Sequence, residues 1–503
     1  MFNPSCSLQF NLITTLLPFA LFIFLTIKLW KKPESRTKPG NLPPGPPKLP
    51  VIGHLHHLLG GLPHHALSRV AQKYGPVLHL YLGQVSTVVI TSRQAAKEVL
   101  RTQDPACADR PESIGSKIIG YDNTDIIFSP YAEYWRQMRK ICILELLGPK
   151  NAKSFVSMRH DEVNRLVKSL QSSAGKPVDL TTKIFTFTSS IMCRAAFGKA
   201  VINDRETLVA MFKEASAMAG GFLAADFFPS FKLLHVLSWN RYKLSRMQRK
   251  LDEILDGIVE EHRSKQSGEF GGEDIVDVLL RMQGNGELEF PITNDNIKAV
   301  IFAMFSAGTE TSSTVLDWAM VELMRNPCVM TKLQTEIREA FTGKTTIEES
   351  DAHTLKYLKF VIKETFRLHP PAPLILRACR DECEVGGYSI PLKSKVLVNV
   401  WAMGRDPEYW DEPEKFRPER FENSSVDLLG NNFEFLPFGA GKRICPGMSF
   451  GLANVELPLA RLLYHFDWEM PEGTRAEELD MTEVGGVTTP RMDHLFLVPV
   501  THV

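Results

Sequence analysis

FGAGKRICPG, residues 438–447, indicates the kind of site around which this chain is built. Its two glycines allow a tight loop whose backbone can approach a flat ligand closely. Cys445 stands directly before a Pro-Gly pair, at the start of an apolar segment, residues 446–466, with helical periodicity. A thiolate in that position is favoured by the unpaired backbone N–H groups and by the helix dipole.

Arg443, two residues before Cys445, adds a guanidinium that can offer a fork of donors to a carboxylate. Thiolate, flexible backbone and cation together suit a porphyrin whose iron binds Cys445 and whose propionates face Arg443. A structural cysteine at a helix start would need neither the glycines nor the arginine. Gly441-Lys442 suggests a phosphate loop, but that motif continues with Ser or Thr, and here an arginine follows.

Hydrophobic periodicity also predicts helices over residues 160–172 and 241–263, and residues 78–91 are predicted to form two short strands around Gly83.

A long helix is predicted upstream of the Cys445 loop, over residues 293–326. Thr293 suits an N-cap, and Pro327 sets the end, so the helix would run about 48 Å at about 1.5 Å per residue. Its middle, residues 307–312, reads AGTETS, which is a poor helix interior on propensity alone. Either the backbone kinks there to admit another group, or small residues form a packing notch. The sequence leaves both open.

A second helix, residues 353–369, carries Glu364 and Arg367 three positions apart and therefore on one face. The residues around them are largely apolar, which predicts that the pair is buried. Buried charges must be paired and hydrogen-bonded, so a further partner is expected. We interpret this pair as scaffolding rather than as catalytic machinery.

These motifs resemble those of the cytochrome P-450 family, and in particular of its plant microsomal members. The likeness covers essentially the whole chain, and four motifs in the family's order are highly specific. It implies a mainly α fold with small β-sheets, preceded by a single transmembrane helix. The matches are F-x-x-G-x-R-x-C-x-G at Phe438, Gly441, Arg443, Cys445 and Gly447, E-x-x-R at Glu364 and Arg367, P-E-R-F at residues 418–421, and A-G-x-E-T-S at residues 307–312.

The resemblance also implies roles for individual residues. Cys445 would be the axial ligand of the iron in haem b. Thr311, with Glu310 beside it, would deliver protons when O2 is cleaved, and Arg420 would complete the network of the buried ion pair. The chain departs from its relatives just before Arg377, where the usual Pro-Arg is missing and the segment is one residue short. The expected haem contacts are Arg443, Trp135, Arg139, Arg377, Phe438, Gly441 and Gly447.

The substrate pocket implied by the resemblance is mostly apolar and offers no arginine for a carboxylate. A small hydrophobic plant metabolite is therefore expected, a terpenoid in the first place, with an alkaloid or a phenolic as alternatives. Packing in the protein core would explain each of the wall residues equally well. The expected wall residues are Ile114, Phe302, Ala303, Ser306, Ala307, Leu374, Ile375, Val484 and Val487.

No flavin or nicotinamide motif is present, so electrons are expected from NADPH through a membrane-bound NADPH–cytochrome P-450 reductase. Lys140, Arg136 and Lys442 could form its docking face or could be ordinary solvated charges. Two rival functions keep the haem: a rearranging enzyme that needs no reductase, and a non-catalytic haem-binding protein. The Glu-Thr pair at 310–311 argues against the first, and the Ala-Gly notch at 307–308 argues against the second.

The N-terminal segment predicts membrane attachment. Residues 8–27 carry no charged side chain, and such a helix spans about 30 Å, the thickness of a bilayer core. Trp30 and a basic cluster follow it, which places the C-terminal side in the cytosol, whereas a cleaved signal would show the reverse order. We expect an endoplasmic reticulum anchor at residues 1–30, a stiff Pro-rich hinge at 31–50 and the haem-binding domain at 51–503.

Overall composition excludes several classes of protein. The 503 residues contain 58 Lys plus Arg and 58 Asp plus Glu, a balance that gives no basis for nucleic-acid binding. Eight scattered cysteines do not form a disulfide framework. Cys379 and Cys383 form a lone C-x3-C, and zinc needs about four ligands, so no zinc site is expected. The histidines at 54, 56, 57, 64 and 65 are predicted to be solvated in loops.

Overall fold

The computed structural model describes residues 41–148, 154–198, 205–220, 223–231, 238–264, 273–284 and 288–502. The predicted anchor at residues 1–30 and the first part of the predicted hinge lie outside these ranges. Within them, none of the helices combines the length and the hydropathy that a membrane span requires.

The strongly periodic segments form helices as predicted. Residues 160–172 fall in α7 (Val156–Gln171), 241–263 in α12 (Trp239–Ser264), 293–326 in α14 (Asn294–Arg325) and 446–466 in α19 (Met448–His465). The predicted helix 353–369 starts later than predicted, as α17 (Lys356–Leu368), because residues 353–355 form a break after α16 (Glu349–Ala352). The carboxylate of Glu336, on the neighbouring α15 (Pro327–Ala340), accepts from the N–H groups of Tyr357 and Leu358, and this tertiary cap starts α17.

The remaining helices include several that are shorter than two turns. They are α2 (Pro63–Tyr74), α3 (Arg93–Lys97), α4 (Ile114–Ile119), α5 (Glu133–Ile141), α8 (Leu180–Phe197), α9 (Arg205–Ala219), α10 (Ala224–Phe227), α13 (Ile275–Gly284) and α18 (Val400–Met403). Short 3-10 or π turns that matter below are η2 (Glu98–Thr102), η3 (Asp104–Cys107), η4 (Cys142–Leu147), η5 (Pro418–Phe421) and η6 (Gly441–Arg443).

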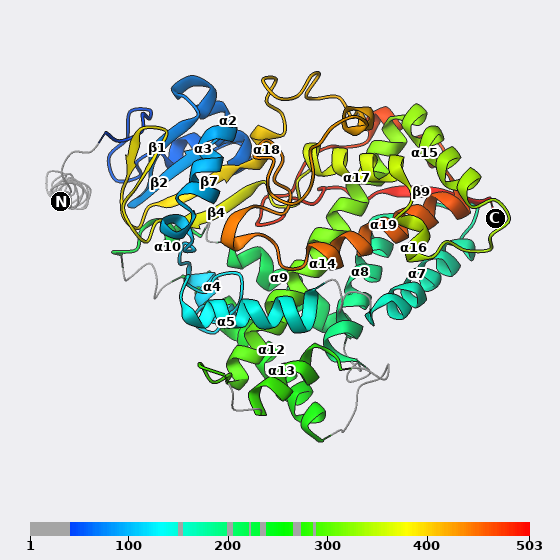
Figure 1. The fold of residues 1–503 in the computed structure, drawn as a ribbon, viewed down its shortest axis with the longest axis horizontal. Coiled ribbons are helices and arrows are strands. Elements are labelled where there is room, and N and C mark those ends of the chain that lie inside the picture. Colours follow the sequence, from blue (N-terminus) through cyan, green and yellow to red (C-terminus); the bar gives the residue numbers. More distant parts are fainter. Residues whose placement is uncertain are drawn as a thin grey trace, which may run out of the picture.

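The main sheet has four strands in the order β1-β2-β7-β4. The predicted hairpin around Gly83 is confirmed as β1 (Val77–Leu82) and β2 (Val85–Ile90), paired antiparallel. β7 (Lys395–Asn399) runs parallel to β2, and β4 (Leu374–Ala378) runs antiparallel to β7. Figure 1 shows this sheet at one end of the molecule, beside α2 and α3, with α14 in the middle and α7, α15 and α19 toward the other end.

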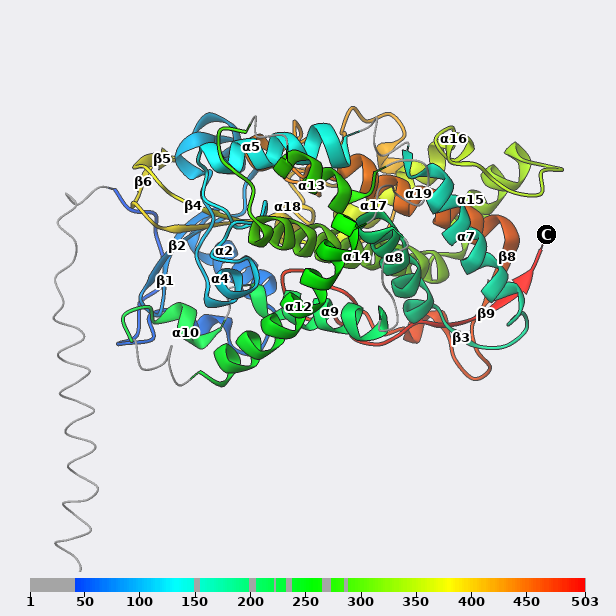
Figure 2. The ribbon, with the colours of Figure 1, turned by 90° about the horizontal axis from the view of Figure 1, so that it is seen from below.

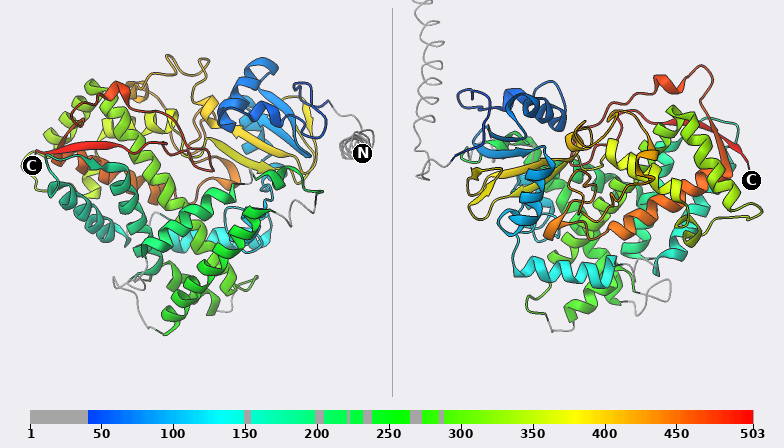
Figure 3. Two further views of the ribbon diagram at one scale, coloured as in Figure 1. Left: turned by 180° about the vertical axis from the view of Figure 1, so that it is seen from behind. Right: turned by 45° about the horizontal axis from the view of Figure 1, so that its top comes forward.

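Two smaller sheets complete the strand content of the described residues. β5 (Cys383–Val385) and β6 (Tyr388–Ile390) form a hairpin, and β3 (Val178–Asp179), β9 (Phe496–Thr501) and β8 (Phe466–Glu469) form the third sheet. Both views in Figure 3 place the main sheet and β9 at opposite ends of the molecule. The result is a mainly α fold with small sheets, as the sequence predicts.

α14 forms the centre of the core and packs along α8 (Figure 2). It is one continuous α-helix, and most of its residues are buried. A Cβ on Gly308 would lie 2.5 Å from the sulfur of Met192 on α8. Of the two alternatives for the Ala-Gly pair, the glycine itself is therefore explained by helix packing, since a larger residue would have to displace the buried Met192 side chain.

The Pro-rich segment at 43–47 lies along β1 instead of projecting freely. The His79 N–H donates to the Pro44 carbonyl at 2.9 Å, and a Cβ on Gly45 would lie 2.3 Å from the His79 carbonyl oxygen. His54 is buried, with its Nε2 2.8 Å from the Pro46 carbonyl and its Nδ1 accepting from the Tyr81 N–H. The prediction that this histidine is solvated is wrong, because its two nitrogens join the segment to the sheet.

Candidate active site

Cys445 lies in a short loop between η6 and α19. Its N–H donates to the Phe438 carbonyl at 2.9 Å and closes the loop on its own start. Burial raises the pKa of the thiol, while the Gly447 N–H and the cation of Arg139 oppose that rise. Because a bound metal ion deprotonates a coordinating thiol, this sulfur is suited to hold one.

The two glycines before Cys445, Gly439 and Gly441, differ in what lies next to them in the protein. Gly441 has a φ of +69°, and a Cβ there would lie 2.2 Å from the Leu100 carbonyl oxygen. This glycine is thus required by contact with η2, rather than by the close approach of a ligand that was expected. Gly439, at φ +71°, meets only Ile375 at 3.9 Å and is the glycine of the loop with open space beside it.

Four arginine side chains converge beside this loop, three of them predicted and one, Arg110, not recognised in the sequence. All of their hydrogen-bond partners are backbone carbonyls. Arg443 donates to Ala108 at 2.8 Å and to Ser129 at 2.5 Å, Arg377 to Ala440 at 3.1 Å, Arg139 to Ile444, and Arg110 to Leu376 and, at 2.9 Å, to Ile127.

Among the described residues no acid is hydrogen-bonded to Arg377 or Arg443, and the charges of Asp104 and Asp109 offset their positive charge only in part. Burial, together with repulsion from the neighbouring arginines, lowers the pKa of Arg443 to about 8 and that of Arg377 to about 9. Within the described part of the chain, Nε of Arg377 and one terminal nitrogen of Arg443 have no hydrogen-bond partner. Buried cations with donors left over are complementary to a ligand that carries carboxylates. The cluster and Cys445 therefore fit a haem with two propionates.

Trp135, for which the resemblance implies contact with haem, makes two kinds of contact within the protein. Its indole N–H donates to the Ile126 carbonyl at 3.0 Å. Its ring lies 4.1 Å from the guanidinium carbon of Arg443 and 5.3 Å from that of Arg139. Trp135 thus orients the two cations through cation–π contact.

Away from its first and last turns, α14 has one exposed residue, Ala307, and the residues on either side of it are partly buried. The Thr311 hydroxyl donates to the Ala307 carbonyl at 2.6 Å, a local bond that competes with the helical ladder. Nearby, the hydroxyl groups of Ser306 and Thr309 are buried and have no partner among the described residues. The helix therefore presents a small side chain and several hydroxyl groups at this point.

Glu310 has a partner that sequence reasoning missed. Its carboxylate accepts from the Thr488 hydroxyl at 3.1 Å. Burial raises the pKa of Glu310 to about 7, and the Thr488 bond and the charge of Lys213 limit that rise. A carboxyl group with this pKa can both give and take a proton at neutral pH. No spacing in the sequence connects position 310 with position 488, so only the fold reveals the contact.

The predicted wall residues fall into two groups. Ile114, Ser306, Ala307, Leu374, Ile375 and Val487 are partly or fully exposed, as surfaces facing a ligand must be. Phe302 and Ala303 are buried, and the Phe302 ring stacks on Phe212 at 5.3 Å, which is core packing. Val484 is 38% exposed, and its N–H donates to the Pro490 carbonyl in a surface turn. It is therefore less enclosed than a wall residue was expected to be.

Two histidines fix the start of the segment that carries Thr488. His64 lies 2.7 Å and His65 3.2 Å from the same carboxylate oxygen of Glu483. Burial would raise the pKa of Glu483, but the hydrogen bond with His64 and the contact with His65 outweigh it and lower the pKa to about 2. His64 is buried, so the prediction of solvated loop histidines is wrong here as well. Its partner lies 419 residues away, beyond the reach of local sequence patterns.

The pair Glu364 and Arg367 forms a closed network. The two side chains are 0% exposed and joined by two bonds of 2.7 and 2.8 Å. Arg420, on η5, is the further partner that burial required, at 2.9 Å from the same carboxylate. The remaining Arg367 donors bind the carbonyls of Gly404, Pro413 and Lys415. The two guanidinium groups thus share one carboxylate, and all of their nitrogens have hydrogen-bond partners within the protein.

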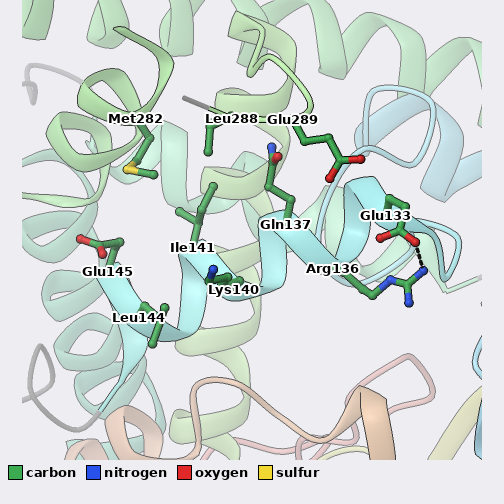
Figure 4. Close-up of a pocket in the computed structure, with 10 residues that line it drawn as sticks. All are labelled: Glu133, Arg136, Gln137, Lys140, Ile141, Leu144, Glu145, Met282, Leu288 and Glu289. Atoms are coloured by element: carbon green, nitrogen blue, oxygen red, sulfur yellow. Dashed lines mark hydrogen bonds and ion pairs between the residues drawn. The ribbon is translucent and has the colours of Figure 1, made fainter. Parts of the chain in front are cut away.

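A separate surface pocket of about 400 Å³ lies against α5 and η4 (Figure 4). It contains Arg136 and Lys140, two of the three residues considered for reductase docking, together with the carboxylates of Glu133, Glu145 and Glu289. Arg136 pairs with Glu133. This surface is therefore mixed in charge and not uniformly basic.

The comparisons with known proteins agree with this geometry. The sequence profile of the family described as Cytochrome P450 matches residues 43–497. Among curated proteins, the chain is similar to Cytochrome P450 71D95 of Mentha spicata, with 59% identity over 95% of this chain and 96% of that protein.

Two further relatives carry names that state a reaction. Premnaspirodiene oxygenase of Hyoscyamus muticus is 56% identical, over 98% of each chain. The 5-epiaristolochene 1,3-dihydroxylase of Nicotiana tabacum is 53% identical, over 97% of this chain and 98% of that one. Among solved structures, a zebra fish cytochrome P450 with abiraterone aligns with a TM-score of 0.74 at 25% identity, covering 88% of this chain and 100% of that one.

Proposed function

Since the chain belongs to the cytochrome P450 family, and is thus a haem-thiolate monooxygenase using haem b, O2 and NADPH-derived electrons, we propose that it hydroxylates a small terpenoid hydrocarbon. The observation that carries this substrate class is the full-length similarity to two relatives named for premnaspirodiene and 5-epiaristolochene. The apolar side chains of Ile114, Leu374 and Ile375 support it, because they offer no partner to a charged substrate.

In this proposal, Cys445 holds the haem iron, and Arg443, Arg377 and Arg139 bind the propionates, with Arg110 as an additional cation. Trp135 keeps two of these arginines in place. The bound haem supplies the oxidation, in which one oxygen atom of O2 enters a C–H bond of the substrate and the other leaves as water.

We assign the proton transfers of the reaction to Thr311 and Glu310, both on α14. The Thr311 hydroxyl, beside the exposed Ala307, is placed to hold a water molecule or to pass a proton. Glu310 can resupply that proton because its pKa is about 7. Thr488 holds the Glu310 carboxylate in one orientation.

We also propose that residues 1–30 anchor the protein in the endoplasmic reticulum membrane with its catalytic domain in the cytosol, and that a reductase docks near Lys442, Arg136 and Lys140. Because Arg136 already pairs with Glu133, Lys442→Glu should slow reduction and change its salt dependence more than Arg136→Glu. Equal reduction rates for both variants and the wild type would place the docking face elsewhere.

The substrate class is tested with the full chain in lipid vesicles together with a reductase. Terpene hydrocarbons, alkaloids and phenolics are supplied in parallel, and products are identified by mass spectrometry. We expect a hydroxylated terpene that appears only when NADPH and reductase are both present. Preferred turnover of a charged substrate, or product formation without reductase, would overturn the proposal.

A further inference from the structure

Three cysteines from separate segments meet beneath the main sheet. Cys107 ends η3, Cys379 follows β4, and Cys383 begins β5. The Cys107 sulfur lies 3.6 Å from that of Cys379 and 3.5 Å from that of Cys383, and the latter two are 3.9 Å apart. The fold thus adds a third sulfur, 272 residues away, to the pair that the sequence shows as a lone C-x3-C.

These distances match the sulfur–sulfur separations in a site where several thiolates bind one metal ion. A zinc–sulfur bond of about 2.3 Å in tetrahedral geometry separates two sulfurs by about 3.8 Å. A disulfide requires about 2.05 Å, and all three cysteines are free. A disulfide would also use only two sulfurs, whereas here the three are nearly equidistant, as one central ion requires.

The surroundings of the cluster favour a soft cation. Cys107 and Cys379 lie in an apolar cluster with side chains such as Val99 and Leu100, while Cys383 is partly exposed. Among the described residues no fourth protein ligand joins the three sulfurs, so the side of Cys383 is left for a solvent ligand.

We propose that Cys107, Cys379 and Cys383 form a binding site for a thiophilic divalent cation of the zinc type, with water or a small thiol as the fourth ligand. As the sulfurs bind, the thiols release their protons to solvent. Metal binding at this site would also stabilise the positions of Arg443 and Arg377 in the arginine cluster. The Ala108 carbonyl, next to Cys107, holds Arg443 at 2.8 Å, and Arg377 stands two residues before Cys379.

The test uses the haem-loaded full chain, so that Cys445 is occupied, and zinc as the probe. Protein equilibrated with zinc and then freed of excess metal is analysed for zinc and iron. We expect a single zinc ion per haem. Cys107→Ser and Cys379→Ser should weaken zinc binding by on the order of a hundredfold or more, because each removes a direct ligand. Cys328→Ser, which changes an exposed cysteine of α15, is the matched control and should bind as the wild type does.

A second measurement covers the case in which the variants fold poorly. Wild-type holoenzyme is alkylated with and without zinc, and the modified cysteines are mapped by mass spectrometry. Zinc should slow modification of Cys383 but leave that of Cys328 unchanged. Zinc that binds the serine variants as tightly as the wild type, or a cluster found as a disulfide that takes up no zinc, would overturn the proposal.

Discussion

Two groups of buried arginines in this molecule have opposite electrostatic arrangements. Arg367 and Arg420 share the Glu364 carboxylate, and the other Arg367 donors bind carbonyl groups. Arg377 and Arg443 have carbonyl partners only, each keeps a nitrogen without a partner, and the pKa values of both are lowered by burial.

This difference in hydrogen-bond partners distinguishes a network that stabilises the fold from a site that binds a ligand. A network whose donors all have partners, and whose two guanidinium groups share a carboxylate, stabilises the fold, whereas buried cations without a hydrogen-bonded acid cost free energy until an anion arrives. The physical mark of the cofactor side is therefore the convergence of several such cations beside the Cys445 loop. It identifies Arg110, which no motif indicated, along with the predicted residues.

The largest effect is expected when the closed network is opened. Glu364→Gln leaves two buried cations without their carboxylate and should destabilise the protein by about 3–5 kcal/mol. We expect a lower melting temperature and a small haem-loaded fraction. The matched control is Glu478→Gln, which breaks an exposed pair with Arg475 and should cost less than about 1 kcal/mol. Equal losses in the two variants would remove the distinction between the networks.

A smaller effect is expected in the arginine cluster, and on a different quantity. Arg443→Leu removes charged donors to a propionate and should weaken haem binding by about 1.5–3 kcal/mol, or roughly 10–150-fold. Haem affinity is measured by transfer of haem to a competing acceptor protein.

The control for this prediction is a buried arginine outside the cluster. Arg461 binds the Ile347 carbonyl and Asn164, so Arg461→Leu should lower stability and leave the haem affinity of the folded fraction unchanged. A loss of haem affinity as large as that of Arg443→Leu would show that any buried arginine has this effect.

The smallest effect concerns Glu310, a partly buried acid that belongs to neither of the two arginine groups. Its raised pKa means that it is protonated below about pH 7, so a rate that draws on its proton should fall as the pH rises through 7. Thr488→Val removes a donor to the carboxylate, which raises the pKa further and should move the midpoint up by up to about one unit. The pH profile of kcat measures this shift.

Glu310→Gln is the reference for that profile and should abolish the midpoint near 7, because the side chain no longer titrates. If the midpoint of the kcat profile is the same in both variants as in the wild type, the titrating group is not Glu310.

The sequence predicted the fold class, the long helices and the β1–β2 hairpin, because hydrophobic period and turn residues are local properties. It did not predict the break before α17, which depends on a cap from Glu336, or the pairing of His64 with Glu483. In the site, the motifs identified Cys445, Arg443 and Glu310. Thr488 and the third sulfur of the cysteine cluster are brought in by tertiary contacts across hundreds of residues, which no spacing records.

The central claim is that the Cys445 sulfur holds the iron of a haem. The most direct measurement is the absorption spectrum of the reduced, carbon-monoxide-bound protein, compared among the wild type, Cys445→Ala and the buried control Cys142→Ala. The account predicts the band typical of thiolate ligation in the wild type and in Cys142→Ala, and its loss in Cys445→Ala. The same band in Cys445→Ala, or full turnover by a haem-free preparation, would contradict it.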